Sequence, residues 1–184
     1  MMSGEAGAAV LETNDDSPKM PDKKKTKFDV VIIGAGPSGY TAGIYCSRAG
    51  YDTLILSGIL PGGQLVNTTE VENYPGFENG IMGPDLMIDM RKQSQRMGTT
   101  IIDDEVVDVD FRRKPLKVLT ASEEYEGRAV IIATGANPRK IGLEGEETFG
   151  GKGVSYCATC DGPFFRNQEI VVVGGGDSAI EEAT

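Results

Sequence analysis

The stretch FDVVIIGAGPSGYTAG, residues 28–43, joins a short apolar run to a glycine-rich turn. Its first six residues are continuous and rich in β-branched side chains, which predicts a strand buried on both faces of a parallel sheet. Gly34, Gly36 and Gly39 follow in the spacing G-x-G-x-x-G, and helical spacing starts at Ser38. The second glycine of such a turn lets a pyrophosphate approach the backbone, and the helix N-terminus favours its negative charge. The stretch therefore predicts dinucleotide binding.

The residues after this turn complete a strand–helix–strand unit. Gly50 provides a helix stop, and the run DTLILS, residues 52–57, predicts a second buried strand. An acidic residue that holds a ribose hydroxyl is expected roughly 20 residues after the motif, at the end of this strand. The sequence offers only Ser57 at that place.

The next segments predict the rest of an α/β domain. GPDLMIDMRKQSQRMG, residues 83–98, has a proline near its start, apolar residues on one side and a glycine stop, which predicts a second helix. EVVDVD, LKVLT and RAVIIAT, from residue 105 to residue 134, are short apolar or alternating runs separated by polar turns. We expect them to form a small antiparallel ribbon that returns to the parent sheet.

A second glycine motif closes the sequence. EIVVVGGGDSAIEEAT, residues 169–184, predicts another strand, a glycine turn and a helix, with Gly174, Gly176 and Ala179 in the spacing G-x-G-x-x-A. Two such motifs suggest two dinucleotides, a flavin and a nicotinamide donor, and electron transfer is the natural reason to hold both. A strand and half a helix cannot bury their own apolar faces, so we expect the sequence to end inside an unfinished domain.

Composition excludes several classes of function. The net charge of −10 over 184 residues argues against nonspecific binding to nucleic acid or to anionic membranes, and no run of about 18 apolar residues occurs. Residues 1–27 hold few large apolar side chains, which predicts a disordered tail without the features of a secretion signal. Three cysteines, two of them in one motif, favour a reducing, cytoplasmic setting.

The pair Cys157 and Cys160 in SYCATCDG allows three interpretations. A zinc site needs further ligands, but only Cys46 remains and the chain has no histidine. Two buried, inert thiols are a second alternative, since free cysteine packs as a small hydrophobe. A redox dithiol is favoured, because a C-x-x-C pair closes a small disulfide and each thiol influences the ionisation of the other. Asp161 would then supply a proton carrier, although it also suits a turn.

With these motifs in view, the sequence closely resembles the low-molecular-weight thioredoxin reductases from about residue 28 to its end. The resemblance rests on GAGPSGYTA, PGGQL, TTEVENYPGF, IIATGA, GKGVSYCATCDGPFF and VVVGGGDSAIEEA, in the order of that family. It implies a Rossmann-like three-layer FAD-binding domain, incomplete at residues 28–140, and the start of a second Rossmann-like, NADPH-binding domain at residues 141–184. Members of the family also lack the acidic residue missing at Ser57, and they continue beyond this point, so a C-terminally truncated chain is expected.

The resemblance also implies roles for particular residues. The cofactor-binding set for FAD is Gly34, Gly36, Pro37, Ser38, Gly39, Gly63, Gln64, Leu65, Asn73, Thr134 and Gly135. The set for NADPH is Gly174, Gly176, Asp177, Ser178 and Ala179. Gln64 and Asn73 carry amides that can donate and accept hydrogen bonds, and they serve equally well to stabilise turns. Cys157, Cys160 and Asp161 are the catalytic set, with Cys160 beside the flavin, Cys157 as the attacking thiol and Asp161 as the proton donor.

The function implied is a flavoprotein disulfide reductase that passes electrons from NADPH through FAD and the Cys157–Cys160 dithiol to thioredoxin. The family also implies a homodimer. Rival interpretations remain open: a related thiol reductase that uses ferredoxin as donor or a peroxiredoxin partner as acceptor, a zinc-binding module, or an inactive fragment.

Overall fold

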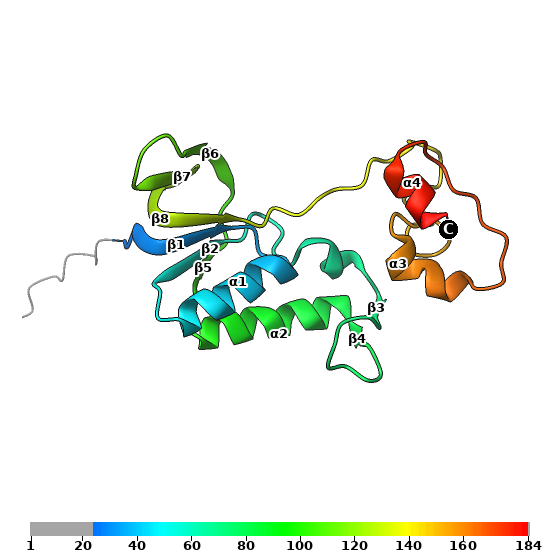
Figure 1. Ribbon diagram of the computed structural model, residues 1–184, viewed down its shortest axis with the longest axis horizontal. Helices are drawn as coiled ribbons and strands as arrows, with labels where there is room; N and C mark the ends of the chain where they lie inside the picture. Colours follow the sequence, from blue (N-terminus) through cyan, green and yellow to red (C-terminus); the bar gives the residue numbers. More distant parts are fainter. Residues whose placement is uncertain (1–23, 184) are drawn as a thin grey trace, which may run out of the picture.

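The computed structural model describes residues 24–183, and most of its regular structure lies before residue 133 (Figure 1). The predicted tail lies outside the described residues as far as residue 23. The elements are β1 (Lys27–Ile33), α1 (Pro37–Arg48), β2 (Thr53–Leu56), β3 (Glu70–Val71), β4 (Ile81–Met82), α2 (Gly83–Arg96), β5 (Thr100–Ile102), β6 (Val106–Asp110), β7 (Leu116–Thr120), β8 (Glu124–Ile132), α3 (Ala158–Asp161) and α4 (Asp177–Glu182). Short 3₁₀ helices span Gly63–Asn67 and Gly162–Phe165.

The main sheet has the strand order β5-β2-β1-β8-β7-β6. Strands β5, β2, β1 and β8 run parallel, whereas β7 is antiparallel to both of its neighbours, β8 and β6. Strand β1 lies between β2, with Val30 opposite Thr53, and β8, with Ile33 opposite Ile132. The structure confirms the strand–helix–strand unit, the second helix and the antiparallel ribbon. Strand β5 was not predicted, because its three residues are too short to give a periodic signal.

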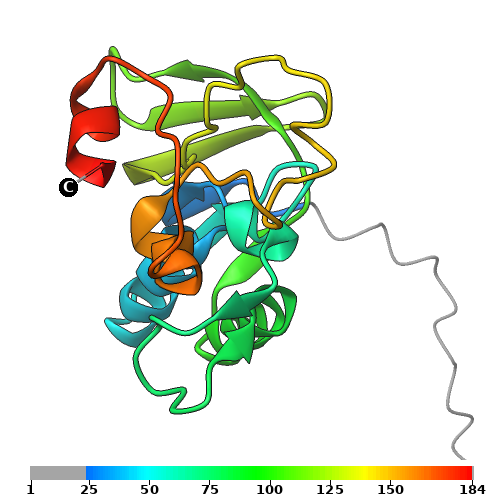
Figure 2. The ribbon, with the colours of Figure 1, turned by 90° about the vertical axis from the view of Figure 1, so that its right-hand side faces the viewer.

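Both faces of β1 are covered, which explains its unbroken apolar sequence. Alternate side chains point to opposite faces of a strand. Val30 and Ile32 pack in a cluster with residues of α1 and α2, whereas Val31 and Ile33 pack in a second cluster with residues of β2, β7 and β8. Figure 2 shows the two helices on one side of the strands and the ribbon of β6 and β7 on the other. Helices, parallel strands and ribbon are therefore three layers.

The chain changes character after β8. It leaves the sheet as an extended segment and reaches α3 and α4 beyond it (Figure 1). The strand predicted at residues 169–173 is wrong for this structure: these residues form no strand, and the side chains of residues 170–173 are exposed. The physical reason is that no strand lies beside them among the described residues, so their backbone groups and apolar side chains have nothing to pair with.

The parallel strands place their carboxyl ends at one edge of the sheet. The connection after β1 leads to β2 on one side, and β8 lies on the other, so the strand order reverses at β1. Ligands of open α/β sheets bind at such a reversal. No helix among residues 24–183 is long and apolar enough to cross a membrane.

Candidate functional site

The first glycine motif has a different structural demand at each glycine. Gly34 has φ +106°, and a Cβ atom there would lie 2.2 Å from the carbonyl oxygen of Ala133. A Cβ on Gly39 would lie 2.0 Å from the carbonyl oxygen of Gly34, so helix and turn touch through their backbones. A Cβ on Gly36 would meet nothing within 4 Å. Gly34 and Gly39 thus close the turn, whereas Gly36 faces open space that a phosphate group can occupy.

Helix α1 begins directly at this open position. Gly36 is its N-cap, Pro37 stands in its first turn, and no side chain caps the helix. The first turn also has no acidic residue. Backbone N–H groups and the positive end of the helix dipole therefore favour an anion in front of Gly36 and Ser38.

Three loops meet at this edge of the sheet. The N–H of Gly34 donates to Leu56 at the end of β2 over 2.8 Å, and the N–H of Ala133 after β8 donates to Ile33 over 2.8 Å. The N–H of Gly62 donates to the carbonyl of Ala35 over 2.9 Å. These bonds bring together the predicted residues of the three loops, namely Gly34, Gly36, Gly63, Thr134 and Gly135.

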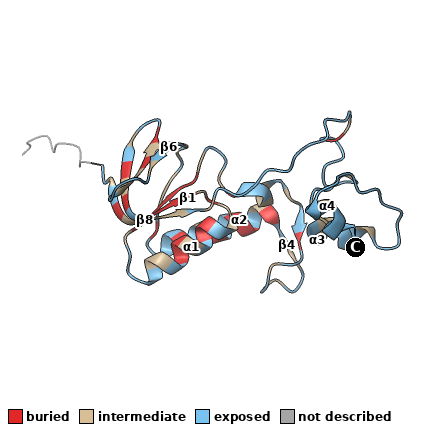
Figure 3. Cartoon of the chain, turned by 45° about the horizontal axis from the view of Figure 1, so that its top comes forward, coloured by how far each residue is buried: buried red, intermediate tan, exposed pale blue. Residues whose placement is uncertain are grey.

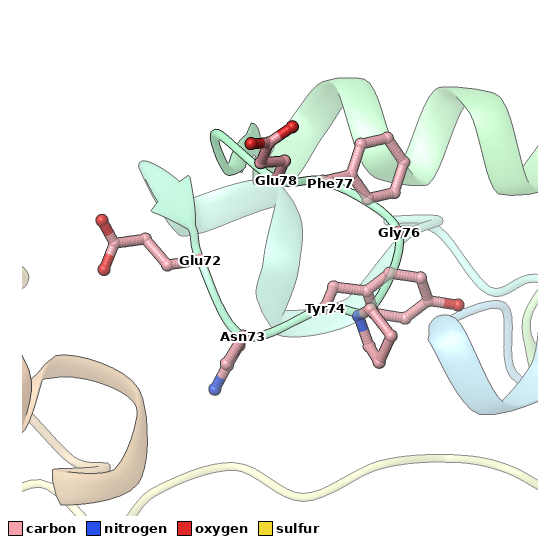
Figure 4. A pocket seen from close by; sticks show the side chains of 7 residues that line it. Glu72, Asn73, Tyr74, Gly76, Phe77 and Glu78 are labelled. Atoms are coloured by element: carbon pink, nitrogen blue, oxygen red, sulfur yellow. The ribbon is translucent and has the colours of Figure 1, made fainter.

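The predicted amides have different settings. The side-chain N–H₂ of Gln64 donates to the side chain of Asn137 over 2.8 Å and, at 3.3 Å, to the carbonyl of Ala136, so it ties the loop after β2 to the segment after β8. Leu65 is half-buried against the core. Asn73 is exposed in the loop of residues 72–78, and Figure 4 shows its amide pointing away from the Tyr74 and Phe77 rings.

The two cysteines form a disulfide at the start of α3. Cys157 is the N-cap of this helix, and its sulfur is bonded to that of Cys160. Asp161 ends the helix, and its Oδ2 accepts a hydrogen bond from the Ser155 hydroxyl over 2.5 Å. The same hydroxyl oxygen accepts the N–H of Cys157 over 3.1 Å. Ser155 therefore links the carboxylate of Asp161 to the backbone of the first cysteine.

A buried carboxylate fixes the segment before the disulfide. Glu146 is 6% exposed, and it accepts the N–H groups of residues 141–143 together with the Tyr156 hydroxyl, which lies 2.5 Å away. The Tyr156 bond and these backbone bonds lower the pKa of Glu146 to about 2. The carboxylate in turn raises the pKa of Tyr156 to about 12. Tyr156 directly precedes Cys157, so the turn at residues 141–147 anchors the chain beside the disulfide.

The second glycine motif repeats part of the geometry of the first. Gly176 is the N-cap of α4, and a Cβ there would meet nothing within 4 Å. A Cβ on Gly174 would lie 2.8 Å from the Cβ of Ala179. A hollow of about 840 Å³ is lined by this motif, including Asp177 and Ser178, and by residues beside the disulfide that include Ala158. The structure thus places the second motif and the first turn of α3 around one hollow.

Comparison with known proteins adds an independent observation. The family model described as pyridine nucleotide-disulphide oxidoreductase matches residues 28–184. The chain belongs to this family. The family combines a pyridine nucleotide with a disulphide, which agrees with the second glycine motif and with the Cys157–Cys160 bond.

Individual relatives agree with this family assignment. A thioredoxin reductase of Listeria innocua is 55% identical over 158 residues, covering 85% of this chain and 49% of the relative. The solved thioredoxin reductase from Giardia duodenalis has a TM-score of 0.81 at 41% identity and covers 86% of this chain and 52% of its own. That from Streptococcus pyogenes has a TM-score of 0.80 at 44% identity, with 87% and 52% covered. The chain spans about half the length of the curated relatives it matches.

The sequence alone did not indicate Ser155, Glu146 or Tyr156. A serine two residues before the first cysteine is a local signal that could have identified Ser155. Glu146 had no such signal, because its partners are backbone groups of an irregular turn and the hydroxyl of Tyr156, ten residues further along the chain. Among the described residues, no three His, Cys, Asp or Glu side chains gather in a way that could hold a metal ion.

Proposed function

We propose that the chain carries the FAD-binding and redox parts of a thioredoxin reductase, which passes electrons from NADPH to thioredoxin. The observation that carries this proposal is the Cys157–Cys160 disulfide, held beside Asp161 in a chain whose first glycine motif is shaped for a dinucleotide. The similarity to thioredoxin reductases supports the same assignment. The assignment of domains to residues 28–140 and 141–184 is part of the proposal.

The residues of the first motif fit a flavin dinucleotide. Gly36 leaves open space at an uncapped helix N-terminus, where the FAD pyrophosphate would be held together with Pro37 and Ser38. Gly63, Gln64, Leu65, Asn73, Thr134 and Gly135 would hold the rest of the cofactor. A bound flavin would supply the capacity to take two electrons from a nicotinamide and to pass them on to a disulfide.

The dithiol performs exchange with a partner disulfide. Two electrons and two protons convert the Cys157–Cys160 disulfide into two thiols. The Cys157 thiolate then attacks the disulfide of oxidised thioredoxin, and a mixed disulfide forms as one partner thiolate leaves. Cys160 attacks Cys157 in that mixed disulfide, so the original bond reforms and thioredoxin leaves as a dithiol. Electrons and protons balance, because thioredoxin gains what the dithiol loses.

Asp161 is the proton carrier in this scheme. Its carboxyl group stands in the same helix as Cys160 and accepts the hydroxyl of Ser155, which orients it. A thiolate is a better leaving group when it is protonated as it departs, and a carboxyl group held beside it can supply the proton. In a chain without histidine, this carboxyl group takes the role of general acid.

The nicotinamide donor belongs to the second motif. Gly174, Gly176, Asp177, Ser178 and Ala179 would hold the NADPH pyrophosphate, supported by the spacing of the motif and by the open position at Gly176. A homodimer and a reducing, cytoplasmic setting complete the proposal, which gives no role to nucleic acid or membrane.

The test starts with the visible absorption spectrum of the purified 184-residue chain, followed by anaerobic addition of NADPH and then oxidised thioredoxin. The proposal expects a flavin spectrum that bleaches with NADPH and thiols that appear on thioredoxin. Cys157→Ser is the matched variant, and its flavin should still bleach while thioredoxin stays oxidised. A chain without flavin contradicts the cofactor assignment. Bleaching by reduced ferredoxin but not by NADPH would indicate another donor.

A further inference from the structure

The carboxylate of Asp103 lies next to Ser57, where the first glycine motif lacks its expected acidic residue. The end of the second strand holds Ser57, which is 6% exposed, in place of the acidic residue that binds a ribose hydroxyl in other dinucleotide folds. Strand β5 lies beside β2, with Ile102 opposite Leu56. The residues that follow these two strand ends therefore also lie next to each other. Asp103 is that residue of β5, and its Oδ1 accepts the Ser57 hydroxyl over 2.6 Å. The neighbouring strand therefore supplies the carboxylate.

Helix α2 fixes the direction of this carboxylate. The two terminal nitrogens of Arg91 donate to Oδ1 and Oδ2 of Asp103 over 2.8 and 2.9 Å, in a bidentate pair. The Arg91 bonds, and after them the Ser57 bond, lower the pKa of Asp103, so it is ionised at neutral pH. The arginine side chain is 27% exposed, and helix and strand together hold the carboxylate in one orientation.

The carboxylate keeps capacity for one more hydrogen bond. An ionised carboxylate has about four acceptor positions, and Ser57 and Arg91 occupy two on Oδ1 and one on Oδ2. The side chain of Asp103 is 53% exposed, so the carboxylate is open to solvent and one acceptor position on Oδ2 has no protein donor. This group also lies at the edge of the first glycine motif, because Leu56, next to Ser57, accepts the N–H of Gly34.

We propose that Asp103 accepts a ribose hydroxyl from the adenosine half of the dinucleotide held by the first glycine motif, with Ser57 and Arg91 as positioning residues. The inference rests on the proposed dinucleotide binding at that motif. A carboxylate at this place also repels a phosphate group on the same ribose. The first site therefore selects an unphosphorylated adenosine, as in FAD, against the 2′-phosphorylated adenosine of NADPH.

The test compares two ligands on two variants by calorimetry of the cofactor-free 184-residue chain. The ligands are ADP and 2′,3′-dideoxy-ADP, which differ only in the ribose hydroxyls. The unmodified chain should bind ADP about tenfold or more tightly than the dideoxy compound, the usual effect of one hydrogen bond to a charged group. Asp103→Asn removes the charge and leaves a weaker, neutral acceptor, so it should lose most of this preference. Asp89→Asn, an exposed aspartate on α2, is the matched control and should keep the preference.

A role limited to pairing α2 with β5 predicts something else. In that case Asp103→Asn lowers stability, but any preference for ADP over the dideoxy compound stays as in the unmodified chain, and the inference is overturned. Ser57→Ala keeps the carboxylate and the Arg91 pair, so it tests the same point without loss of an ion pair, and the preference should shrink but persist. A full preference in Ser57→Ala contradicts its role as a positioning residue.

The two proposals fail in distinguishable ways. If the unmodified chain binds neither FAD nor ADP, dinucleotide binding at the first motif is wrong and the ribose contact falls with it. If the chain binds FAD and ADP but does not distinguish ADP from its dideoxy analogue, only the role of Asp103 is wrong. Competition by 2′-phosphorylated ADP-ribose as strong as that by ADP-ribose overturns the selectivity.

Discussion

The two glycine motifs have similar turns in very different surroundings. Gly36 and Gly176 are both helix N-caps with extended backbones, at φ −84° and ψ −171° in the first and φ −98° and ψ 176° in the second. Neither would bring a Cβ within 4 Å of another atom. Yet the run before Gly34 is a strand buried on both faces, whereas the run before Gly174 forms no strand and is exposed (Figure 3).

A short sequence is enough to form a glycine turn, whereas a strand also needs neighbouring segments. A glycine turn and the start of a helix depend on a few consecutive residues, so both motifs form them. A strand needs hydrogen-bonding partners and a covered face, which β2 and β8 supply for β1 and which no described segment supplies for residues 169–173. Similar spacing can therefore follow a paired, buried strand or an unpaired, exposed segment.

The largest expected difference between the two regions is the loss in free energy of unfolding when an apolar side chain is truncated. Leu54→Ala removes a fully buried side chain from β2 and should lower the free energy of unfolding by about 3 kcal/mol. Val172→Ala, in the exposed run before the second motif, should change it by less than about 0.5 kcal/mol. Urea unfolding followed by circular dichroism measures both. A large effect of Val172→Ala would mean that this run packs in solution.

A smaller contrast lies within the first motif. Gly39→Ala forces a methyl group against the Gly34 carbonyl and should destabilise the chain by about 2 kcal/mol. Gly36→Ala meets open space, so stability should change by only about 1 kcal/mol, the usual cost of alanine at an N-cap. Its FAD affinity should nevertheless fall at least about tenfold, because the methyl group enters the space for the pyrophosphate. Urea unfolding and FAD titration check the pair.

The polar contacts of the second region should be visible in titration. The raised pKa of Tyr156, about 12 against the usual 10.0, means that its neutral phenol stabilises the bond to Glu146. That stabilisation is present below pH 10 and is lost as the pH rises from 10 to 12. The difference between the ultraviolet titration curves of the unmodified chain and Tyr156→Phe isolates this phenol. A midpoint at pH 10 would contradict the contact.

The smallest expected effect concerns the disulfide. Reduction of Cys157–Cys160 should leave the unfolding midpoint of the sheet unchanged, because none of the residues of α3 belongs to either core cluster. A disulfide stabilises the part of a chain whose unfolded state it constrains, and this one closes a loop outside the sheet. Urea unfolding with and without a reductant compares the two states. A shifted midpoint would show coupling between the two regions.

Prediction from the sequence succeeded where the signal was local. The apolar run at residues 28–33, the glycine spacing from Gly34 to Gly39 and the helix starting near Pro84 all depend on neighbouring residues, and the structure has each of them. Strand β5 at Thr100–Ile102 was not predicted, because it forms only through its pairing with β2. The strand predicted at residues 169–173 was wrong for the same reason: their apolar, β-branched sequence favours a strand, but no described segment pairs with it.

The residues of the candidate site also divide into those that a local sequence signal indicates and those that depend on folding. The glycines and the C-x-x-C pair were identified from spacing alone, and their roles as ligand-binding and catalytic residues stay predictions. Glu146 and Asp103 could not be identified, because each depends on partners brought close only by folding: backbone groups of an irregular turn for one, and a serine and an arginine from two other elements for the other. Charged residues on loops carry little signal in a single sequence.

The position of β8 determines how late the central strand can complete its pairing during synthesis. Strand β1 pairs with β8 at Lys27 and Glu126, so the two sides of the central pairing are 99 positions apart in the chain. During synthesis β1 can meet β2 early, but its other edge stays unpaired until residue 132 has left the ribosome. Such distant pairing slows folding and leaves an apolar strand edge available for wrong contacts. A nascent chain that pauses before β8 would thus be a natural client for a chaperone.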